Sequence, residues 1–238
     1  MSPRPFTRRT TTKSGNAPRA RCPACFLQPR LCVCGLIAPL ALATRVVVYR
    51  HRKEVHKPTN TGRLAVLCLA NSELRTFGGR DEPFDARGLD DPEQRVLLLY
   101  PRADARVLGR EQFGPERDAR APRDGSDERD ARPVTLLVPD ADWRRAQKLA
   151  RGEPALERVA AVCLADGAPS EFRLRKHPDA RYLSTFEGIA RALGVLEGDA
   201  VRAELERVFR VFVDRALYQR GQLAAELVTG GVPPRDDA

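Results

Sequence analysis

Long apolar stretches are missing from this sequence of 238 residues. No run approaches the roughly 18 apolar residues that a membrane span requires, so we expect neither a transmembrane helix nor a membrane partner. The first twenty residues also lack the apolar centre of a signal peptide, which predicts a cytoplasmic protein. Because the cytoplasm disfavours disulfides, the six cysteines of the chain need another explanation.

Acidic residues are fewer than basic ones, with 32 Asp and Glu against 41 Lys and Arg and a net charge of +9. This excess predicts attraction to a polyanion, most simply a nucleic acid, with an affinity that falls as salt rises. An alternative stays open, because an arginine-rich composition can also reflect genomic base composition. Hydrophobic residues at 42% and charged residues at 31% are typical of a globular protein. Nothing in the sequence indicates an obligate protein partner.

Two segments lack apolar periodicity. Residues 1–20 carry five positive charges and predict a disordered basic arm. Residues 102–132 carry eight acidic and eight basic side chains with few large apolar ones, which predicts an exposed charged insertion. We expect a short cysteine-containing element at 21–36, one main domain at 37–225 and a tail at 226–238.

The main domain alternates two kinds of pattern. Nearly continuous apolar runs at 45–49, 96–100, 134–138 and 159–164 are typical of strands buried on both faces. Helical patterns lie at about 61–70, 141–151, 185–196 and 201–220. This alternation predicts an α/β fold with a mostly parallel sheet, whose ligand site lies beyond the carboxyl ends of the strands.

Four cysteines occur within thirteen residues of the N-terminal element. Four thiolates suit a tetrahedral zinc ion, which can stabilise a segment too short to have its own core. An iron–sulfur cluster or reactive thiols are the alternatives. Cys68 and Cys163 stand alone in apolar segments and are interpreted as core residues. The expected metal ligands are Cys22, Cys25, Cys32 and Cys34.

Several short motifs follow one another along the rest of the chain. They are HRKE at 51–54, PTNTGRL at 58–64, LLYP at 98–101, VPDADWRRA at 138–146, SEFRLR at 170–175 and LSTFE at 183–187. Together with the cysteines, this ordered set resembles the DTW-domain proteins, the tRNA-uridine aminocarboxypropyltransferases, from about residue 21 to residue 223. The sequence departs from the family's Asp-x-Thr-Trp pattern at one position, where Asp142 replaces the threonine.

The resemblance implies a SPOUT-like α/β fold with a C-terminal trefoil knot, S-adenosylmethionine as donor and tRNA as acceptor. The 37–225 domain is then the catalytic domain. The sulfonium of the donor makes three carbons electrophilic, so the carbon that the pocket presents decides which group is transferred. The implied reaction moves the 3-amino-3-carboxypropyl group to N3 of a uridine and releases methylthioadenosine.

The uridine N3 must lose a proton, and a carboxylate is a natural general base for that step. We expect Asp140 to be this base, although its place between a strand and a helix also fits a helix N-cap. Asp142 adds a like charge that tends to raise the pKa of Asp140, or simply lies in the favourable first turn of the helix. Trp143 is either a core residue or a stacking platform.

The remaining site residues fall into two groups. Ser184 and Glu187 fit a capping box, and the resemblance adds a cofactor-binding role at this junction. The expected cofactor-binding residues are Leu99, Tyr100, Pro101, Val138, Pro139, Leu183, Ser184, Thr185 and Glu187. The expected substrate-binding or supporting residues are His51, Glu54, Asn60, Thr61, Asp142, Trp143, Ser170, Arg173 and Arg175, the arginines suiting a carboxylate or phosphate.

Two other functions remain open at this point. An RNA methyltransferase uses the same donor and presents its methyl group instead. A non-catalytic, zinc-containing RNA-binding module would account for the basic arm and the cysteines but leaves Asp140, Ser184 and Glu187 without a purpose.

Overall fold

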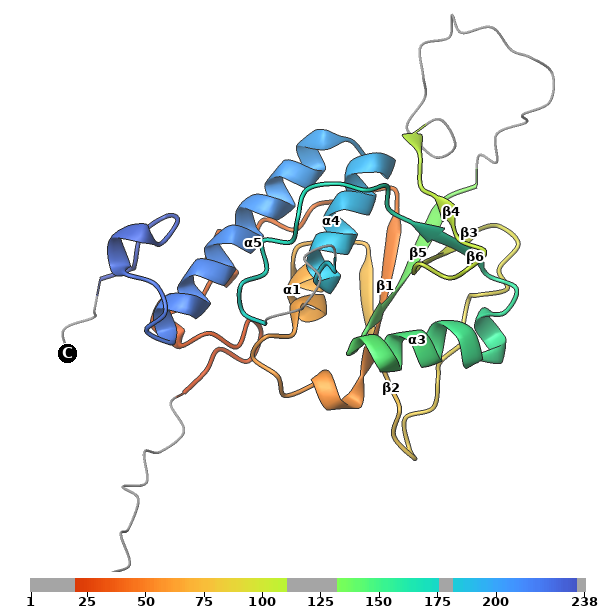
Figure 1. Ribbon diagram of the computed structural model, residues 1–238, viewed down its shortest axis with the longest axis horizontal. Coiled ribbons are helices and arrows are strands. Elements are labelled where there is room, and N and C mark those ends of the chain that lie inside the picture. The colour runs from red at the N-terminus through yellow and green to blue at the C-terminus, as the bar shows by residue number, and fades with distance from the viewer. Residues whose placement is uncertain (1–19, 111–131, 176–181, 235–238) are drawn as a thin grey trace, which may run out of the picture.

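The computed structural model describes residues 20–110, 132–175 and 182–234 (Figure 1). Almost all of the expected basic arm, residues 111–131 of the expected insertion and the last four residues of the tail lie outside these ranges. Lys176 and His177, which directly follow the expected site residue Arg175 in the sequence, lie outside them as well.

The centre of the fold is a six-stranded sheet in which every strand pair is parallel. This confirms the predicted α/β class and mostly parallel sheet, and each of the four predicted strands is present. The strand order is β2-β1-β5-β3-β6-β4. The strands are β1 (Arg45–His51), β2 (Ser72–Phe77), β3 (Arg95–Leu99), β4 (Arg106–Val107), β5 (Val134–Asp140) and β6 (Ala160–Cys163).

Both faces of the central strands are buried, as the continuous apolar runs predict. Val46 and Val48 of β1 pack into one core, while Val47 and Tyr49 pack into a second core on the opposite face. Alternate side chains of a strand point to opposite faces, so a strand between two cores has to be apolar at nearly every position.

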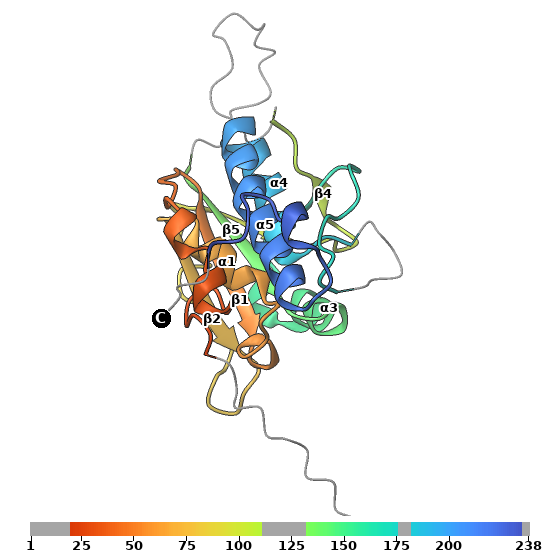
Figure 2. The same cartoon turned by 90° about the vertical axis from the view of Figure 1, so that its left-hand side faces the viewer.

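Helices cover the two faces of the sheet unequally (Figures 1 and 2). α1, α4 and α5 contribute to the larger core on one face, and α3 contributes to the smaller core on the other. None of the helices within the described ranges is long and apolar enough to cross a membrane. The α-helices are α1 (Thr61–Leu67), α3 (Trp143–Gly152), α4 (Thr185–Leu196) and α5 (Asp199–Gln219), and the 3-10 helices are η1 (Pro29–Leu31), η2 (Cys34–Leu36), η3 (Arg52–Glu54), η4 (Pro154–Leu156) and η5 (Ala225–Leu227).

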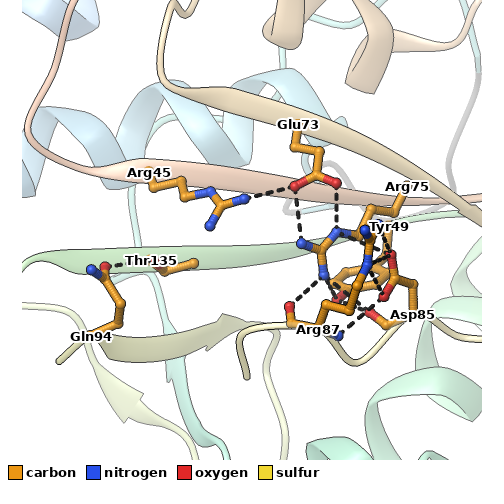
Figure 3. A network of polar contacts seen from close by, with 8 residues as sticks. All are labelled: Arg45, Tyr49, Glu73, Arg75, Asp85, Arg87, Gln94 and Thr135. Atoms are coloured by element: carbon orange, nitrogen blue, oxygen red, sulfur yellow. Dashed lines mark hydrogen bonds and ion pairs between the residues drawn. The ribbon is translucent and has the colours of Figure 1, made fainter. Parts of the chain in front are cut away.

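The edge strand β2 has no counterpart among the predicted strands. The strand carries polar residues and therefore lacks the apolar pattern that predicts a buried strand. Arg75, for example, is only 7% exposed, and it donates hydrogen bonds to residues at least ten positions later or more than twenty earlier in the chain. Arg75 donates to the carbonyls of Asp85 and Arg87 and to the hydroxyl of Tyr49, which itself donates to the Asp85 carbonyl at 2.6 Å (Figure 3). Arg75 also pairs with Glu73. This network holds the segment after β2 against the smaller core.

The expected insertion at 102–132 needs a correction at its start. Arg102 donates to the carbonyls of Leu156 and Val159 at 3.0 and 2.8 Å, and Leu108 is only 3% exposed. Between them β4 pairs with β6. A two-residue strand with exposed side chains leaves no apolar pattern, so the sequence alone gives no signal for it.

Candidate active site and metal centre

Asp140 is the last residue of β5 and lies where three segments of the chain converge. Its side chain is almost completely buried, with 4% of the residue exposed. One carboxylate oxygen accepts a hydrogen bond from Asn60 Nδ2 at 2.5 Å, and the other accepts one from Thr185 Oγ1 at 2.7 Å. The carboxyl end of the sheet thus meets the first turns of α1 and α4 at this carboxylate, in the region where a parallel sheet places its ligand site.

Burial raises the pKa of the Asp140 carboxyl above its ordinary value. The hydrogen bonds from Asn60 and Thr185 act in the opposite direction, since they stabilise the charged form. The nearby Glu54 carboxylate adds to the rise. A buried carboxylate with a raised pKa accepts a proton more readily than one in water, which suits a general base.

The beginning of α1 is built around this carboxylate. Asn60 caps the helix, because its Oδ1 accepts the backbone N–H of Arg63 at 3.0 Å while its Nδ2 reaches Asp140. A Cβ atom on Gly62 would lie 2.6 Å from Asp140 Oδ2, so only glycine permits this close approach. Thr61, also buried, accepts a hydrogen bond from the backbone N–H of Phe186 at the start of α4.

The helix after β5 is capped by Asp142, and the alternative of Asp140 as N-cap is wrong. Asp142 Oδ1 accepts the backbone N–H of Arg145 at 3.0 Å, and its other oxygen pairs with the Arg145 guanidinium. Asp140 lies two residues earlier, still within the strand, so its carboxylate is not used for capping. Capping therefore accounts for the acid at position 142.

An aromatic cluster flanks this helix start. Trp143 is 38% exposed, stacks on Tyr100 with ring centroids 5.3 Å apart, and meets Tyr182 edge-on at 4.6 Å. Trp143 is therefore partly exposed and not a core residue, and its role as a stacking platform stays a prediction. The hydroxyl of Tyr100 is buried and has no hydrogen-bond partner within the described part of the chain. Burial raises the pKa of this phenol, so it remains a neutral donor.

The predicted capping box at α4 is confirmed. Ser184 Oγ accepts the backbone N–H of Glu187, and Glu187 Oε2 accepts the backbone N–H of Ser184 at 2.8 Å. The same carboxylate accepts the hydroxyl of Ser170 and the backbone N–H of Glu171. Glu187 therefore fastens the segment after β6 to the start of α4, and a contact with the donor stays a prediction.

The other expected cofactor residues line the neighbouring strand ends. Leu99 ends β3, and a Cβ atom on Gly188 of α4 would lie 3.8 Å from its Cδ2. Val138 is buried in the core, Pro139 and Leu183 are partly buried, and Pro101 is exposed. The structure thus brings the ends of β3 and β5 and the start of α4 together, and donor binding by these residues stays a prediction.

Glu54 and the arginines at 173 and 175 form ion pairs inside the chain. Glu54 is 2% exposed and accepts from Lys57 Nζ at 2.5 Å and from Arg175 at 2.9 Å. Burial alone would raise the pKa of Glu54, but these hydrogen bonds outweigh it and lower the pKa. Arg173 pairs with the buried Asp214 of α5. Both arginines therefore anchor the segment 170–175, and their contact with substrate stays a prediction.

His51 is the last residue of β1 and lies at the carboxyl end of the sheet. Burial, and after it the charge of Arg145, lowers the pKa of its imidazole, which favours the neutral form near pH 7. Its Nδ1 accepts the backbone N–H of Lys53, which leaves Nε2 as the protonated nitrogen. A Cβ atom on Gly78 would lie 2.6 Å from Nε2, and Gly78 has a positive φ of 91°. The glycine lets the chain pass beside the ring.

Two arginines near Asp140 were not among the predicted site residues. Arg50 lies opposite Asp140 in the strand register, and its buried Nε has no partner among the described residues. Arg63 is 9% exposed and donates to the carbonyl of Val55. Burial lowers the pKa of both guanidinium groups, while the charge of Asp140 raises it. The alternation along β1 places Arg50 on the same face as Val46 and Val48, but only the strand register shows that it lies opposite Asp140.

The four N-terminal cysteines form one compact cluster. Their sulfur atoms all lie within 4.8 Å of one another, with Cys22 and Cys34 at 3.8 Å and Cys25 and Cys32 at 3.7 Å. These separations are much too long for disulfides. Four sulfurs bound tetrahedrally to zinc at about 2.3 Å lie about 3.8 Å apart, so the cluster fits a zinc ion. The expected set of metal ligands is therefore brought together.

The cysteine element is part of the main core. Leu27, Leu31 and Val33 are each no more than 2% exposed and pack with the helices of the larger core. Gln28 donates its backbone N–H to the side chain of Gln219, and Arg215 donates to the carbonyl of Cys32. Cys68 is buried in the same core, as predicted, whereas Cys163 is only partly buried.

Comparison with known proteins gives two consistent results. The profile of the family described as "DTW domain" matches residues 19–217. The chain is 28% identical over 187 residues to "tRNA-uridine aminocarboxypropyltransferase 2" of Drosophila melanogaster, a match that covers 75% of this chain and 67% of that protein. Proteins of the same name from Macaca fascicularis and Mus musculus are each 26% identical, over 75% and 91% of this chain.

The matched regions cover 57% of the Macaca protein and 71% of the Mus protein, so the chain corresponds to only part of each relative. No solved structure matches the chain significantly.

Proposed function

The chain belongs to the DTW-domain family, and from this premise we propose that it transfers the 3-amino-3-carboxypropyl group of S-adenosylmethionine to N3 of a uridine in tRNA. The activity for which the relatives are named supports the reaction class. The buried carboxylate of Asp140, held at the carboxyl ends of the strands by Asn60 and Thr185, is the observation that carries the proposal.

The proposed chemistry needs one proton acceptor and one electrophilic carbon. Asp140 takes the proton from uridine N3, and the freed electron pair forms the bond to the terminal carbon of the aminocarboxypropyl group. The carbon–sulfur bond of the donor breaks, and its electron pair stays on sulfur. The products are the modified uridine, neutral methylthioadenosine and a protonated Asp140, which releases its proton to solvent.

The residues around Asp140 have supporting roles in this proposal. Leu99, Tyr100 and Pro101 would hold the donor together with residues 138–139 and 183–185. The buried Tyr100 hydroxyl supports this placement, because an unpaired buried donor is costly unless a ligand accepts from it. Trp143, partly exposed next to Tyr100, would stack on the uridine base.

The finer structural class belongs to the same proposal. We assign the fold to the SPOUT-like group with a C-terminal trefoil knot. Two features support this assignment: the parallel sheet, and the return of the chain from β6, between β3 and the edge strand β4, to α4, which packs on α1 and β5. The connection includes residues 176–181, which lie outside the described ranges, so threading stays a prediction. A cytoplasmic location and a structural zinc ion complete the proposal.

Product analysis tests the proposed reaction. The full chain is incubated with tRNA and S-adenosylmethionine labelled in the aminocarboxypropyl group, and the nucleosides and small products are separated by mass spectrometry. Labelled uridine together with methylthioadenosine is the expected result. S-adenosylhomocysteine would assign the protein to the methyltransferases, and absence of any donor-dependent product would overturn the enzymatic function.

A further inference from the structure

A concave site, separate from the residues around Asp140, lies between the cysteine element and the C-terminal end of α5. The cavity has a volume of about 230 Å³. In Figure 1 the N-terminal segment, in red, lies beside the end of α5, in blue. The lining residues are Arg21, Phe26, Leu27, Gln28, Pro58, Ala216, Gln219 and Arg220. None of them belongs to the predicted donor site.

The charge of this cavity is unbalanced. Arg21 and Arg220 are both exposed, and neither forms an ion pair with any residue in the described ranges. One nitrogen of each guanidinium is nevertheless fixed, because Arg21 donates to the Phe26 carbonyl at 2.9 Å and Arg220 donates to the Leu174 carbonyl at 3.1 Å. The remaining N–H groups are positioned but not neutralised, which is the arrangement that binds a phosphate.

The other polar groups of the cavity suit a nucleobase. Gln219 Oε1 accepts the backbone N–H of Gln28 at 2.8 Å, so the amide oxygen is occupied and its NH₂ group remains as a donor. Phe26 supplies an aromatic ring, held in place by the Arg63 guanidinium 3.7 Å above its centroid. A planar ring with adjacent amide and guanidinium donors is typical of sites for single-stranded RNA.

The cavity is close to the candidate active site along two short stretches of chain. Pro58 lines it, and Asn60, two residues later, donates to Asp140. Leu174 anchors Arg220, and the next residue, Arg175, pairs with Glu54 and donates to Thr59. A nucleic acid whose uridine reached Asp140 would therefore have neighbouring nucleotides beside this cavity.

We propose that the cavity formed by Arg21, Phe26, Gln28, Gln219 and Arg220 binds one nucleotide of the RNA substrate that flanks the target uridine. This inference rests on the proposed function, because it takes RNA as the substrate. The two guanidinium groups bind the phosphodiester, and Phe26 with the glutamine amides contacts the base. The cysteine element thus takes part in substrate recognition.

The test compares tRNA binding by matched double variants of the full chain, in the absence of the donor. Arg21→Gln with Arg220→Gln removes the two cavity charges. Arg106→Gln with Arg158→Gln removes two exposed charges elsewhere, at the edge strand β4 and just before β6. Affinity is measured across a salt series by fluorescence anisotropy, and folding is checked by thermal melting.

We expect the cavity variant to bind tRNA on the order of tenfold more weakly at low salt, with the salt slope reduced by about 0.7 for each lost phosphate contact. The control variant should retain the salt slope of the wild-type chain. Arg21→Lys with Arg220→Lys should recover most of the slope, since the charge is restored. Donor affinity, measured by calorimetry, should be equal in all variants.

Three outcomes would overturn the inference. They are equal affinity and slope in the cavity and control variants, competition by inorganic phosphate but not by a poly-uridine oligonucleotide, and competition by an acidic peptide as strong as that by the oligonucleotide. A wild-type chain that does not bind tRNA would instead overturn the proposed function, so the two failures are distinguishable.

Discussion

At the scale of single residues, Asp140 combines burial with two hydrogen bonds from uncharged donors. Asn60 and Thr185 can donate to either a carboxylate or an amide oxygen, so they do not by themselves require a charge at position 140. A residue that only packed the core would not need to be acidic. Burying a carboxylate at neutral pH costs free energy of folding, and the proposed proton transfer explains why an acid is found at this position.

Replacing Asp140 with Asn tests this residue as the base. The amide can accept from Asn60 and donate to Thr185, so folding should survive while the transfer rate falls by about 10²- to 10⁴-fold. Donor and tRNA affinities should stay near wild type, and high pH should partly rescue the rate by ionising uridine N3. Single-turnover rates against pH measure this. An unchanged rate, or a loss of donor affinity as large as the loss of rate, would contradict the assignment.

The Asp140 carboxyl should make the protein less stable as pH rises. Burial raises the pKa of Asp140, so its contribution to the free energy of unfolding is fully present below the unfolded pKa and is lost as pH rises through the folded pKa. Asp140→Asn should therefore be at least as stable as wild type at neutral pH. Its advantage should shrink as pH falls, which urea unfolding at several pH values measures.

The Glu54 carboxyl should have the opposite effect on the pH dependence of stability. Its pKa is lowered, so its stabilisation is present above the unfolded pKa and is lost as pH falls through the folded pKa. Glu54→Gln should lose about 1–3 kcal/mol of unfolding free energy at neutral pH, because two charge-assisted hydrogen bonds weaken. Exposed Glu157→Gln is the matched control and should be nearly neutral. Equal stability of the two variants at neutral pH would show that the Glu54 ion pairs contribute nothing.

At the scale of helices and strands, the approach of α1 to the end of β5 determines the site. The helix can lie this close only because position 62 has no side chain. The glycines in the first turns of α1 and α4 therefore differ in the space around them. Gly62 lies against Asp140 and leaves no room for a side chain, whereas Gly188 has room for a methyl group.

The substitutions Gly62→Ala and Gly188→Ala test whether the close approach at position 62 matters for stability and turnover. Alanine at 188 should be neutral or stabilise by about 0.5–1 kcal/mol, since alanine favours helices. Alanine at 62 should destabilise by about 1–3 kcal/mol through overpacking and should reduce turnover by moving Asn60 and Asp140 apart. Thermal melting and turnover are the measurements. A Gly62→Ala variant as active and stable as Gly188→Ala would show that the close approach is unimportant.

The predictability of these elements follows from how each is stabilised. Strands β1, β3, β5 and β6 are buried on both faces, so the sequence alone predicts them. Strand β2 has buried polar groups whose partners lie in the segment after it, and β4 is too short to form a pattern. The site shows the same division, because Ser184 and Glu187 form a local capping box, whereas the position of Arg50 opposite Asp140 depends on strand register.

At the scale of the whole molecule, the cysteine element completes the larger core. Its apolar residues, Leu27, Leu31 and Val33, pack with α4 and α5 and are almost fully buried. Hydrogen bonds from Gln28 to Gln219 and from Arg215 to Cys32 add polar links across the same contact. A metal at the four cysteines would therefore stabilise the entire domain and not only its N-terminal segment.

We predict one zinc ion per chain and a marked loss of thermal stability when it is removed. Burial acts to raise the pKa of Cys22, but hydrogen bonds from the backbone N–H groups of Cys25 and Ala24 outweigh it and lower this pKa to about 7. Burial raises the pKa of Cys25 and Cys34, so these thiols depend on the metal to release their protons. Metal analysis and melting with and without a chelator are the measurements. Cys25→Ser should lose the metal, whereas Cys163→Ser should retain it. A fully folded, metal-free chain or an iron–sulfur absorption band would contradict this prediction.

The two hydrogen bonds to Asp140 also fix when the site can exist during protein synthesis. Asn60 precedes Asp140 by 80 residues, and Thr185 follows it by 45. A ribosome that adds about 5–20 residues per second needs about 2–9 s to reach Thr185 after Asp140. Throughout that interval the nascent chain holds the carboxylate without its second anchor and without the helix that buries it. The chain should therefore become competent only after α4 has left the ribosome, so a stalled or truncated product ending before Thr185 should be inert toward the tRNAs that surround it.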